Sequence, residues 1–156
     1  MNHHILTDTE MVDMMRKAGL RPSAQRLAVL RYVGNSHSHP DSDEIYNEIL
    51  HGFPSLSRST VYNSLHALVE AGLVRELEID AGNRHYDLAP QPPHAHFICR
   101  GCGTIFDMPL PEGFAPVDMQ GFEIDSVDVY GKGLCPACTA SPTDTKLNTN
   151  IKNTTE

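Results

Sequence analysis

Two Cys-x-x-Cys motifs constrain the fold of this chain more than any other feature. They use all four cysteines, Cys99 with Cys102 and Cys135 with Cys138, and 32 residues separate the two pairs. In a reducing compartment, cysteine pairs at this spacing favour a bound metal over disulfides. Four thiolates are a tetrahedral ligand set of structural zinc. Two disulfides, or a redox-active thiol pair, are the alternatives. The motifs therefore predict a C-terminal half that folds around a closed zinc site, with no open coordination position for chemistry.

Two histidines lie just before the first of these motifs and need a separate explanation. His94 and His96 are two residues apart, so on a strand their side chains would point to the same face. Two imidazoles are too few to complete a metal site, and further ligands have to come from other parts of the chain. The candidates are His39, Asp87 and Asp107, with His85 as the second choice to Asp87 on the same strand face. Spacing alone does not decide whether these residues meet.

Length, hydropathy and charge limit the class of protein. A chain of 156 residues, 40% of them hydrophobic, is long enough for one or two small domains. It has no run of 18 apolar residues, and its start lacks the pattern of a signal peptide, so we expect a cytoplasmic protein without a membrane segment. The net charge of −8 divides into −2 for residues 1–72 and −6 for residues 73–156. A nearly neutral first half can still present a basic face.

The first half of the chain carries four helical patterns. The first covers residues 8–18, the second opens at Ser23, the third opens at Asp41, and the fourth covers residues 58–71 and ends at Gly72. Their apolar positions recur at helical spacing and are expected to form one core. These positions are Met11, Met14, Met15, Leu27, Leu30, Val33, Ile45, Ile49, Leu50, Val61, Leu65, Leu68 and Val69.

A short turn with one glycine and one proline joins the third and fourth helices, as in a helix-turn-helix. On the fourth helix the apolar stripe leaves polar side chains near the N-terminus, where the helix dipole also favours phosphate. Such side chains can reach phosphates and base edges of DNA. They are Arg58, Ser59, Thr60, Tyr62 and Asn63. A solvated polar face is the alternative interpretation of this pattern.

Two segments that alternate apolar and polar residues follow the fourth helix. They lie on either side of Ala81 and Gly82, and this arrangement predicts a β-hairpin. A hairpin directly after a helix-turn-helix makes a winged helix. We therefore expect a winged-helix DNA-binding domain over residues 1–88.

The second half begins after a proline-rich segment. Residues 89–94 contain three prolines and are expected to form a hinge. Residues 95–138 hold strand-like segments around the cysteines and are expected to form a second domain. Residues 139–156 are rich in Thr and Asn with few apolar side chains, which is typical of a disordered tail. The sequence thus predicts an α+β protein of two domains.

Several motifs follow one another along residues 8–138. They are GLRPSAQRLAVL, HPDSDEIY, STVYNSLHALVEAGLV, HAHFICRGCG and the closing Cys-x-x-Cys. Taken in this order, they resemble the ferric uptake regulator family of bacterial metalloregulators. The resemblance implies a homodimer of winged helices, each with an α/β dimerisation domain, that binds operator DNA and represses transcription when a divalent metal is bound. It implies no enzyme activity. A catalytic metal site is the alternative for the His and Asp residues, but the chain has no HExxH motif.

The resemblance also assigns the candidate ligands to two metal sites. One structural Zn²⁺ per subunit falls on the four cysteines, and a regulatory Fe²⁺ or Mn²⁺ falls on His39, Asp87, His94, His96 and Asp107. Nitrogen and oxygen ligands suit Fe²⁺ or Mn²⁺, whereas thiolates select zinc. Because the regulatory ligands come from both sides of the hinge, a bound cation would fix the angle between the two domains. In a dimer it would then set the spacing of the two recognition helices.

The ligand types indicate one branch of the family. Three histidines with two aspartates, together with Asn63, are similar to the peroxide-sensing branch, in which bound iron reacts with hydrogen peroxide and a liganding histidine is oxidised. His39 and His94 match the oxidation-sensitive positions. A repressor of metal homeostasis genes that responds to iron, or to another divalent metal, is the alternative.

Overall fold

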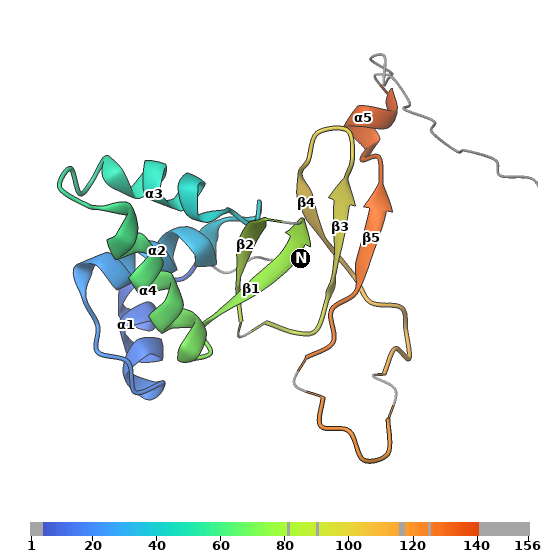
Figure 1. Ribbon diagram of the computed structural model, residues 1–156, viewed down its shortest axis with the longest axis horizontal. Helices are drawn as coiled ribbons and strands as arrows, with labels where there is room; N and C mark the ends of the chain where they lie inside the picture. Colours follow the sequence, from blue (N-terminus) through green and yellow to red (C-terminus); the bar gives the residue numbers. More distant parts are fainter. Residues whose placement is uncertain (1–4, 81, 90, 116–117, 125, 141–156) are drawn as a thin grey trace, which may run out of the picture. The chain divides into compact units, whose positions relative to one another are not determined.

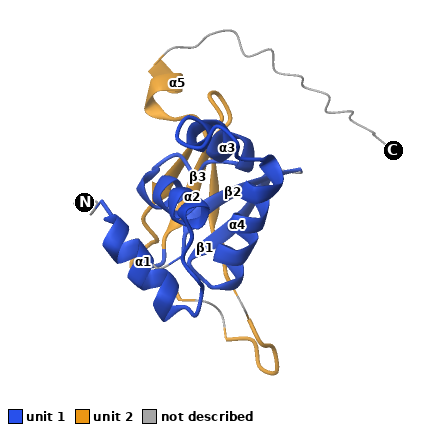
Figure 2. Ribbon diagram, turned by 90° about the vertical axis from the view of Figure 1, so that its left-hand side faces the viewer, with its two compact units in different colours: residues 1–93 blue, residues 94–156 orange. Residues whose placement is uncertain are grey.

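The computed structural model describes residues 5–80, 82–89, 91–115, 118–124 and 126–140 (Figure 1). The chain divides into two compact units, residues 1–93 and 94–156, which Figure 2 colours separately. The division falls within the segment that the sequence analysis treats as a hinge. From residue 141 on, the tail expected over residues 139–156 lies outside the described residues, whereas Thr139 and Ala140 end a helix.

The first unit starts with four helices, and each begins at a side chain that caps it. Thr7, Ser23, Asp41 and Ser57 each accept a hydrogen bond from a backbone N–H of the first turn, which satisfies a donor that the helix itself cannot pair. The caps of the second and third helices are the ones that the sequence predicts. The helices are α1 (Asp8–Lys17), α2 (Ala24–Asn35), α3 (Ser42–Leu50) and α4 (Arg58–Glu70).

One apolar core fills the space between these helices and the hairpin that follows. Most of the predicted core positions are buried in it, and Met14, Leu27 and Val69 are only partly buried against it. The predicted core position Leu50 is also only half-buried. Burial of such side chains stabilises a small domain by roughly 1.5–3 kcal/mol each. The predicted positions that are buried are Met11, Met15, Leu30, Val33, Ile45, Ile49, Val61, Leu65 and Leu68.

A two-stranded antiparallel sheet follows α4 and completes a winged helix. It consists of β1 (Val74–Asp80) and β2 (Asn83–Leu88). The segment before α3 is attached to β2, because the N–H of Tyr86 donates to the carbonyl of Pro40 at 3.0 Å and a bridge joins Asp41 to His85. The chain just before α3 is therefore held beside the second wing strand.

The second unit is a small three-stranded sheet followed by a short helix. β3 (Ala95–Cys99) lies in the middle, antiparallel to β4 (Ile105–Met108) and parallel to β5 (Tyr130–Gly133), and α5 (Pro136–Ala140) follows. The last strand is only four residues long. Across the described part of the chain, no helix has the length and apolarity needed to cross a membrane.

Candidate metal centres and nucleic-acid interface

The four cysteines converge at one end of the second unit. Their sulfur atoms all lie within 4.8 Å of one another, and Cys102 Sγ is 3.9 Å from Cys135 Sγ. Tetrahedral zinc with Zn–S bonds of about 2.3 Å places its sulfurs roughly 3.8 Å apart. None of the four is in a disulfide. The cysteines are therefore positioned to form a zinc site, as the two motifs predict.

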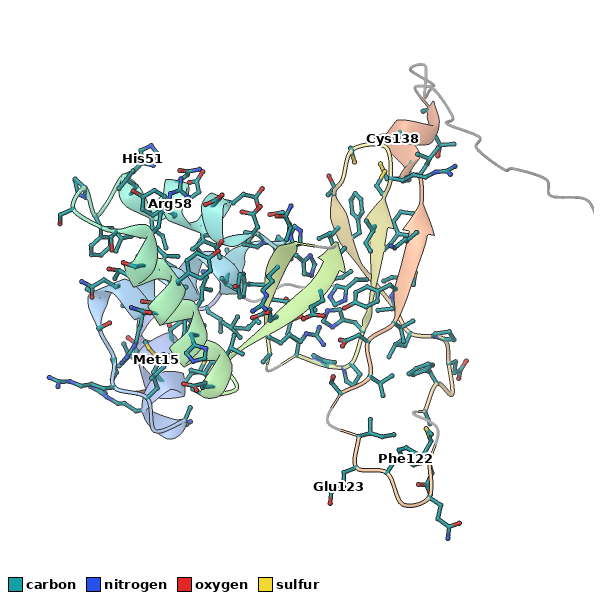
Figure 3. The ribbon with its side chains drawn as sticks, viewed as in Figure 1. Met15, His51, Arg58, Phe122, Glu123 and Cys138 are labelled. Atoms are coloured by element: carbon teal, nitrogen blue, oxygen red, sulfur yellow. The ribbon has the colours of Figure 1, made fainter. Side chains whose placement is uncertain are left out.

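Two segments of the chain position these cysteines, the turn between β3 and β4 and the start of α5. Cys99 ends β3, Cys102 lies in the turn before β4, Cys135 precedes α5, and Cys138 is on α5 (Figure 3). A Cβ atom added at Gly101 would lie 2.9 Å from Sγ of Cys138, so the close approach of the two segments requires glycine there. The sequence carries no signal for α5, because five residues are too few for a helical pattern to show.

Hydrogen bonds prepare this cluster to hold negative charge. The pKa of Cys99 is lowered to about 6, because backbone N–H groups of Cys102 and Cys135 donate to its sulfur. The pKa of Cys102 is lowered by the Thr104 hydroxyl. The pKa of Cys138 is raised to about 12, because its thiol donates hydrogen bonds to the sulfurs of Cys135 and Cys99, which stabilises the protonated form. Only when a bound cation displaces the protons of all four thiols can all four cysteines act as thiolate ligands.

In the second unit, three predicted ligands form a compact group. Asp107 Oδ1 lies 3.4 Å from His94 Nε2 and 3.9 Å from His96 Nε2, and the two imidazole ring centroids are 4.8 Å apart. Ligands of one divalent cation, with bonds of about 2.1 Å, lie roughly 3–4 Å from one another. These side chains therefore fit one metal ion. β3 begins at Ala95, so His96 is on the strand, whereas His94 lies just before it, at the end of the predicted hinge segment.

An aromatic side chain that the sequence analysis missed contacts this group. Tyr130 is the register partner of His96 on β5, and the two rings stack with centroids 6.0 Å apart and planes inclined by 29°. His96 is thus held between Asp107 on β4 and Tyr130 on β5. Such outer contacts fix the orientation of an imidazole that binds a metal.

In the first unit, the other two predicted ligands face each other. His39 Nε2 lies 3.9 Å from Asp87 Oδ1. His39 has a φ of 50°, in the left-handed region that non-glycine residues rarely adopt and that occurs often at functional sites. The carbonyl of His39 lies 2.8 Å from Nδ1 of His85, which can donate to it when protonated. Nδ1 of His85, the second-choice ligand, is therefore engaged with the backbone of His39 and is not available to a metal.

Asp87 also contacts a residue that the sequence analysis did not select. Arg75 is its direct register partner on β1, and Arg75 Nη2 lies 2.8 Å from Asp87 Oδ2. The sequence does not show this pair, because the register shifts by one residue between Glu78 and Asp80, and counting outward from the turn would have set Glu76 opposite Asp87. The first unit therefore presents Asp87 already paired with a cationic side chain.

The predicted DNA-contacting residues gather at the start of α4. Arg58, Ser59, Tyr62 and Asn63 are exposed, whereas Thr60 is half-buried. Tyr62 is 55% exposed and accepts a hydrogen bond from the Ser42 hydroxyl at 3.2 Å. This end of α4 is the part of a helix-turn-helix that reads DNA in known complexes.

Arg58 is held by residues of α3. Figure 3 labels Arg58. Its guanidinium pairs with the Asp43 carboxylate, and its Cζ lies 4.5 Å from the centre of the Tyr46 ring. A carboxylate and a DNA phosphate would compete for the same guanidinium. The ion pair with Asp43 would therefore have to break before the Arg58 guanidinium could bind a phosphate.

Comparison with known proteins decides the family. The model of the ferric uptake regulator family matches residues 17–129, most of the chain. The chain belongs to this family. Members of the ferric uptake regulator family are metal-responsive regulators of transcription and not enzymes, and this confirms the class of function that the sequence motifs indicate.

Two relatives carry names that bear on the branch. The chain is 38% identical to the transcriptional regulator FurA of Mycobacterium tuberculosis over 138 residues, which are 86% of this chain and 93% of that protein. It is 40% identical to the peroxide-responsive repressor PerR of Staphylococcus epidermidis over 134 residues, which are 83% of this chain and 88% of that protein. The two similarities are nearly equal, so they do not separate the peroxide-sensing branch from the alternative.

Solved structures of other members agree with the fold. The ferric uptake regulator of Helicobacter pylori, described with three functional metal-binding sites, is similar with a TM-score of 0.66 and 25% identity, over 89% of this chain and 98% of that chain. A zinc uptake regulator in complex with zinc and DNA is similar with a TM-score of 0.63 and 25% identity, over 86% of this chain and 97% of that chain. The expected α+β fold is confirmed.

Proposed function

We propose that this ferric uptake regulator family member is a metal-dependent repressor that binds operator DNA as a homodimer and senses hydrogen peroxide. The observation that carries the proposal is the occurrence of two incomplete ligand groups. The first unit offers His39 and Asp87, and the second offers His94, His96 and Asp107, each group with spacings near 3.4–3.9 Å. Neither group alone completes the coordination of Fe²⁺ or Mn²⁺.

One cation shared by both groups would have five nitrogen and oxygen ligands. Such a set suits Fe²⁺ or Mn²⁺, and the four cysteines would hold structural zinc. Because the ligands come from both units, binding would favour one orientation of the first unit relative to the second. Moving such an equilibrium from mostly open to mostly closed takes about 5 kcal/mol of differential binding, which several metal–ligand bonds can provide.

A homodimer would use this orientation to read DNA. The second unit exposes large apolar side chains, and a second copy of the chain is the partner that would cover them. Phe122 on the connection between β4 and β5 is among them (Figure 3). In the dimer, two α4 helices would meet adjacent major grooves only at a matching separation. The exposed side chains are Phe106, Phe114, Met119, Phe122, Ile124, Val127 and Leu134.

Peroxide sensing would act on the same ligands. Bound Fe²⁺ would supply the chemistry that reduces hydrogen peroxide beside a liganding imidazole. His39 or His94 would take one oxygen atom from the peroxide, and the other oxygen leaves as water. An oxidised imidazole is a poorer ligand, so the units would lose their link and the protein would release DNA.

Metal dependence is tested with DNA selected from a random-sequence duplex pool by the Mn²⁺-loaded protein. We expect wild type to bind the selected DNA only with Mn²⁺. We expect His94→Ala to lose this metal-dependent DNA binding while it keeps its zinc and its fold. His51→Ala removes an exposed histidine from the end of α3 and serves as the matched control. Equal affinity with and without Mn²⁺ in wild type would refute the metal-dependent repressor.

Peroxide sensing is tested on anaerobic Fe²⁺-loaded protein treated with hydrogen peroxide, with the Mn²⁺-loaded protein as the control. We expect a gain of one oxygen atom on a peptide that contains His39 or His94, and loss of DNA binding. Iron-dependent DNA binding that survives peroxide, without this modification, would instead establish the iron-responsive repressor.

A further inference from the structure

Arg75 and Asp87 form a pair near the open end of the wing hairpin, far from its turn. They are direct register partners on β1 and β2, and Arg75 Nη2 lies 2.8 Å from Asp87 Oδ2. The Arg75 side chain is 31% exposed and that of Asp87 only 7%. A charge-assisted hydrogen bond to a buried carboxylate is among the stronger side-chain interactions in a protein.

The other carboxylate oxygen is engaged as well. Asp87 Oδ1 accepts from the backbone N–H of Leu88 at 2.8 Å and lies 3.4 Å from Nε2 of Gln91. The candidate ligand His39 approaches this oxygen, with Nε2 at 3.9 Å. A divalent cation arriving beside His39 would thus meet a carboxylate whose charge a guanidinium already neutralises.

We propose that Arg75 competes with the regulatory cation for Asp87 and so sets the metal concentration at which the protein switches. The guanidinium satisfies the carboxylate while the metal is absent, and the cation displaces it on binding. Arg75 is a positioning residue that acts through Asp87 and is itself no ligand. This inference rests on the proposed function, because it needs Asp87 to bind the regulatory metal.

The same hairpin offers a matched control. Arg84 Nη1 lies 2.7 Å from Glu76 Oε1, so this pair also joins β1 to β2 through a guanidinium and a carboxylate. Arg84 is 63% exposed, and neither partner is a candidate ligand. Arg84→Gln removes the same charge from the same hairpin without touching Asp87.

The experiment uses the full-length, zinc-loaded protein and titrates it with Mn²⁺, with free Mn²⁺ followed by its electron paramagnetic resonance signal. We expect Arg75→Gln to bind Mn²⁺ about tenfold more tightly than wild type, because one charge-assisted hydrogen bond no longer has to be broken. Arg84→Gln should bind like wild type. Equal tightening in both variants would indicate a general effect of net charge and would overturn the competition.

Thermal unfolding gives a readout that a merely structural role would not produce. In Arg75→Gln the metal-free protein should melt at a lower temperature than wild type, because Asp87 is left without its counter-ion. With saturating Mn²⁺ the two melting temperatures should coincide. If Arg75 only held the hairpin together, both states would be destabilised equally and Mn²⁺ affinity would not rise.

A double-variant cycle completes the test. In an Asp87→Asn background there is no carboxylate to compete for, so adding Arg75→Gln should leave Mn²⁺ affinity unchanged. Tightening that persists there would overturn the proposal. Two further outcomes separate this inference from the proposed function. The competition alone is wrong if wild type binds Mn²⁺ and His96→Ala abolishes that binding, but Arg75→Gln leaves the affinity unchanged. If wild type binds no Mn²⁺, both are wrong.

Discussion

His96 and Asp107 are direct partners across β3 and β4, with His96 Nε2 3.9 Å from Asp107 Oδ1. The turn between these strands carries Cys102, and the N–H of Cys99 donates to the carbonyl of Thr104 at 3.0 Å where the turn closes. One antiparallel hairpin therefore sets both the first cysteine pair and the histidine–aspartate group. A change of register in this hairpin would disturb both metal centres at once.

The Asp107 carboxylate should contribute its charge to metal binding. We predict that Asp107→Asn weakens Mn²⁺ binding at least about tenfold, because a neutral oxygen replaces an anionic ligand. Zinc content should not change. Asp118→Asn, which removes an exposed charge from the connection between β4 and β5, is the control and should bind Mn²⁺ like wild type. Similar affinities for Asp107→Asn and Asp118→Asn, measured by calorimetry, would exclude Asp107 as a ligand.

Gly101 should be required for the cysteine cluster. We predict that Gly101→Ala loses most of its zinc, because the added Cβ would lie 2.9 Å from Sγ and 3.0 Å from Cβ of Cys138. Cys99→Ser gives the limiting case, with loss of both zinc and the dimer. Gly52→Ala is the control, because its Cβ would meet no atom nearer than 3.8 Å. Zinc is measured per chain by atomic emission, and the dimer by light scattering. A Gly101→Ala protein with full zinc content would contradict this packing.

Asp43 should restrain DNA binding through Arg58. We predict that Asp43→Asn binds the selected DNA severalfold more tightly and with a steeper dependence on salt, because a freed guanidinium can contact a phosphate. Asp13→Asn is the control, since it removes the same charge from an exposed pair with Arg16 on α1. Fluorescence anisotropy over a range of salt concentrations makes the comparison. Equal gains in the two variants would mean that only net charge matters.

The helices of the first unit could be predicted from the sequence because their signals are local. Ser23 and Asp41 cap α2 and α3 as expected, and the apolar spacing identifies most of the core. The hairpin follows from alternation around a two-residue turn. The second unit has shorter strands, and α5 with only five residues carries too little periodicity to be seen in advance.

The ligand groups could be predicted only in part. The cysteine site could be predicted because the Cys-x-x-Cys spacing of each pair is typical of zinc ligands. His96 and Asp107 meet because of strand register, which composition and motif spacing do not give. Arg75 and Tyr130 were missed for the same reason, because each becomes relevant only as a cross-strand neighbour of a candidate ligand. The left-handed backbone of His39 likewise has no signal in the sequence.

The central claim is that one cation is bound by ligands from both units. Pulsed electron paramagnetic resonance of Mn²⁺-loaded protein, which counts the imidazole nitrogens coupled to the metal, tests it most directly. We predict three coupled imidazoles in wild type and two in each of His39→Ala, His94→Ala and His96→Ala. A nitrogen count in His39→Ala that equals that of wild type would show that the first unit contributes no histidine to the site, and would contradict the account.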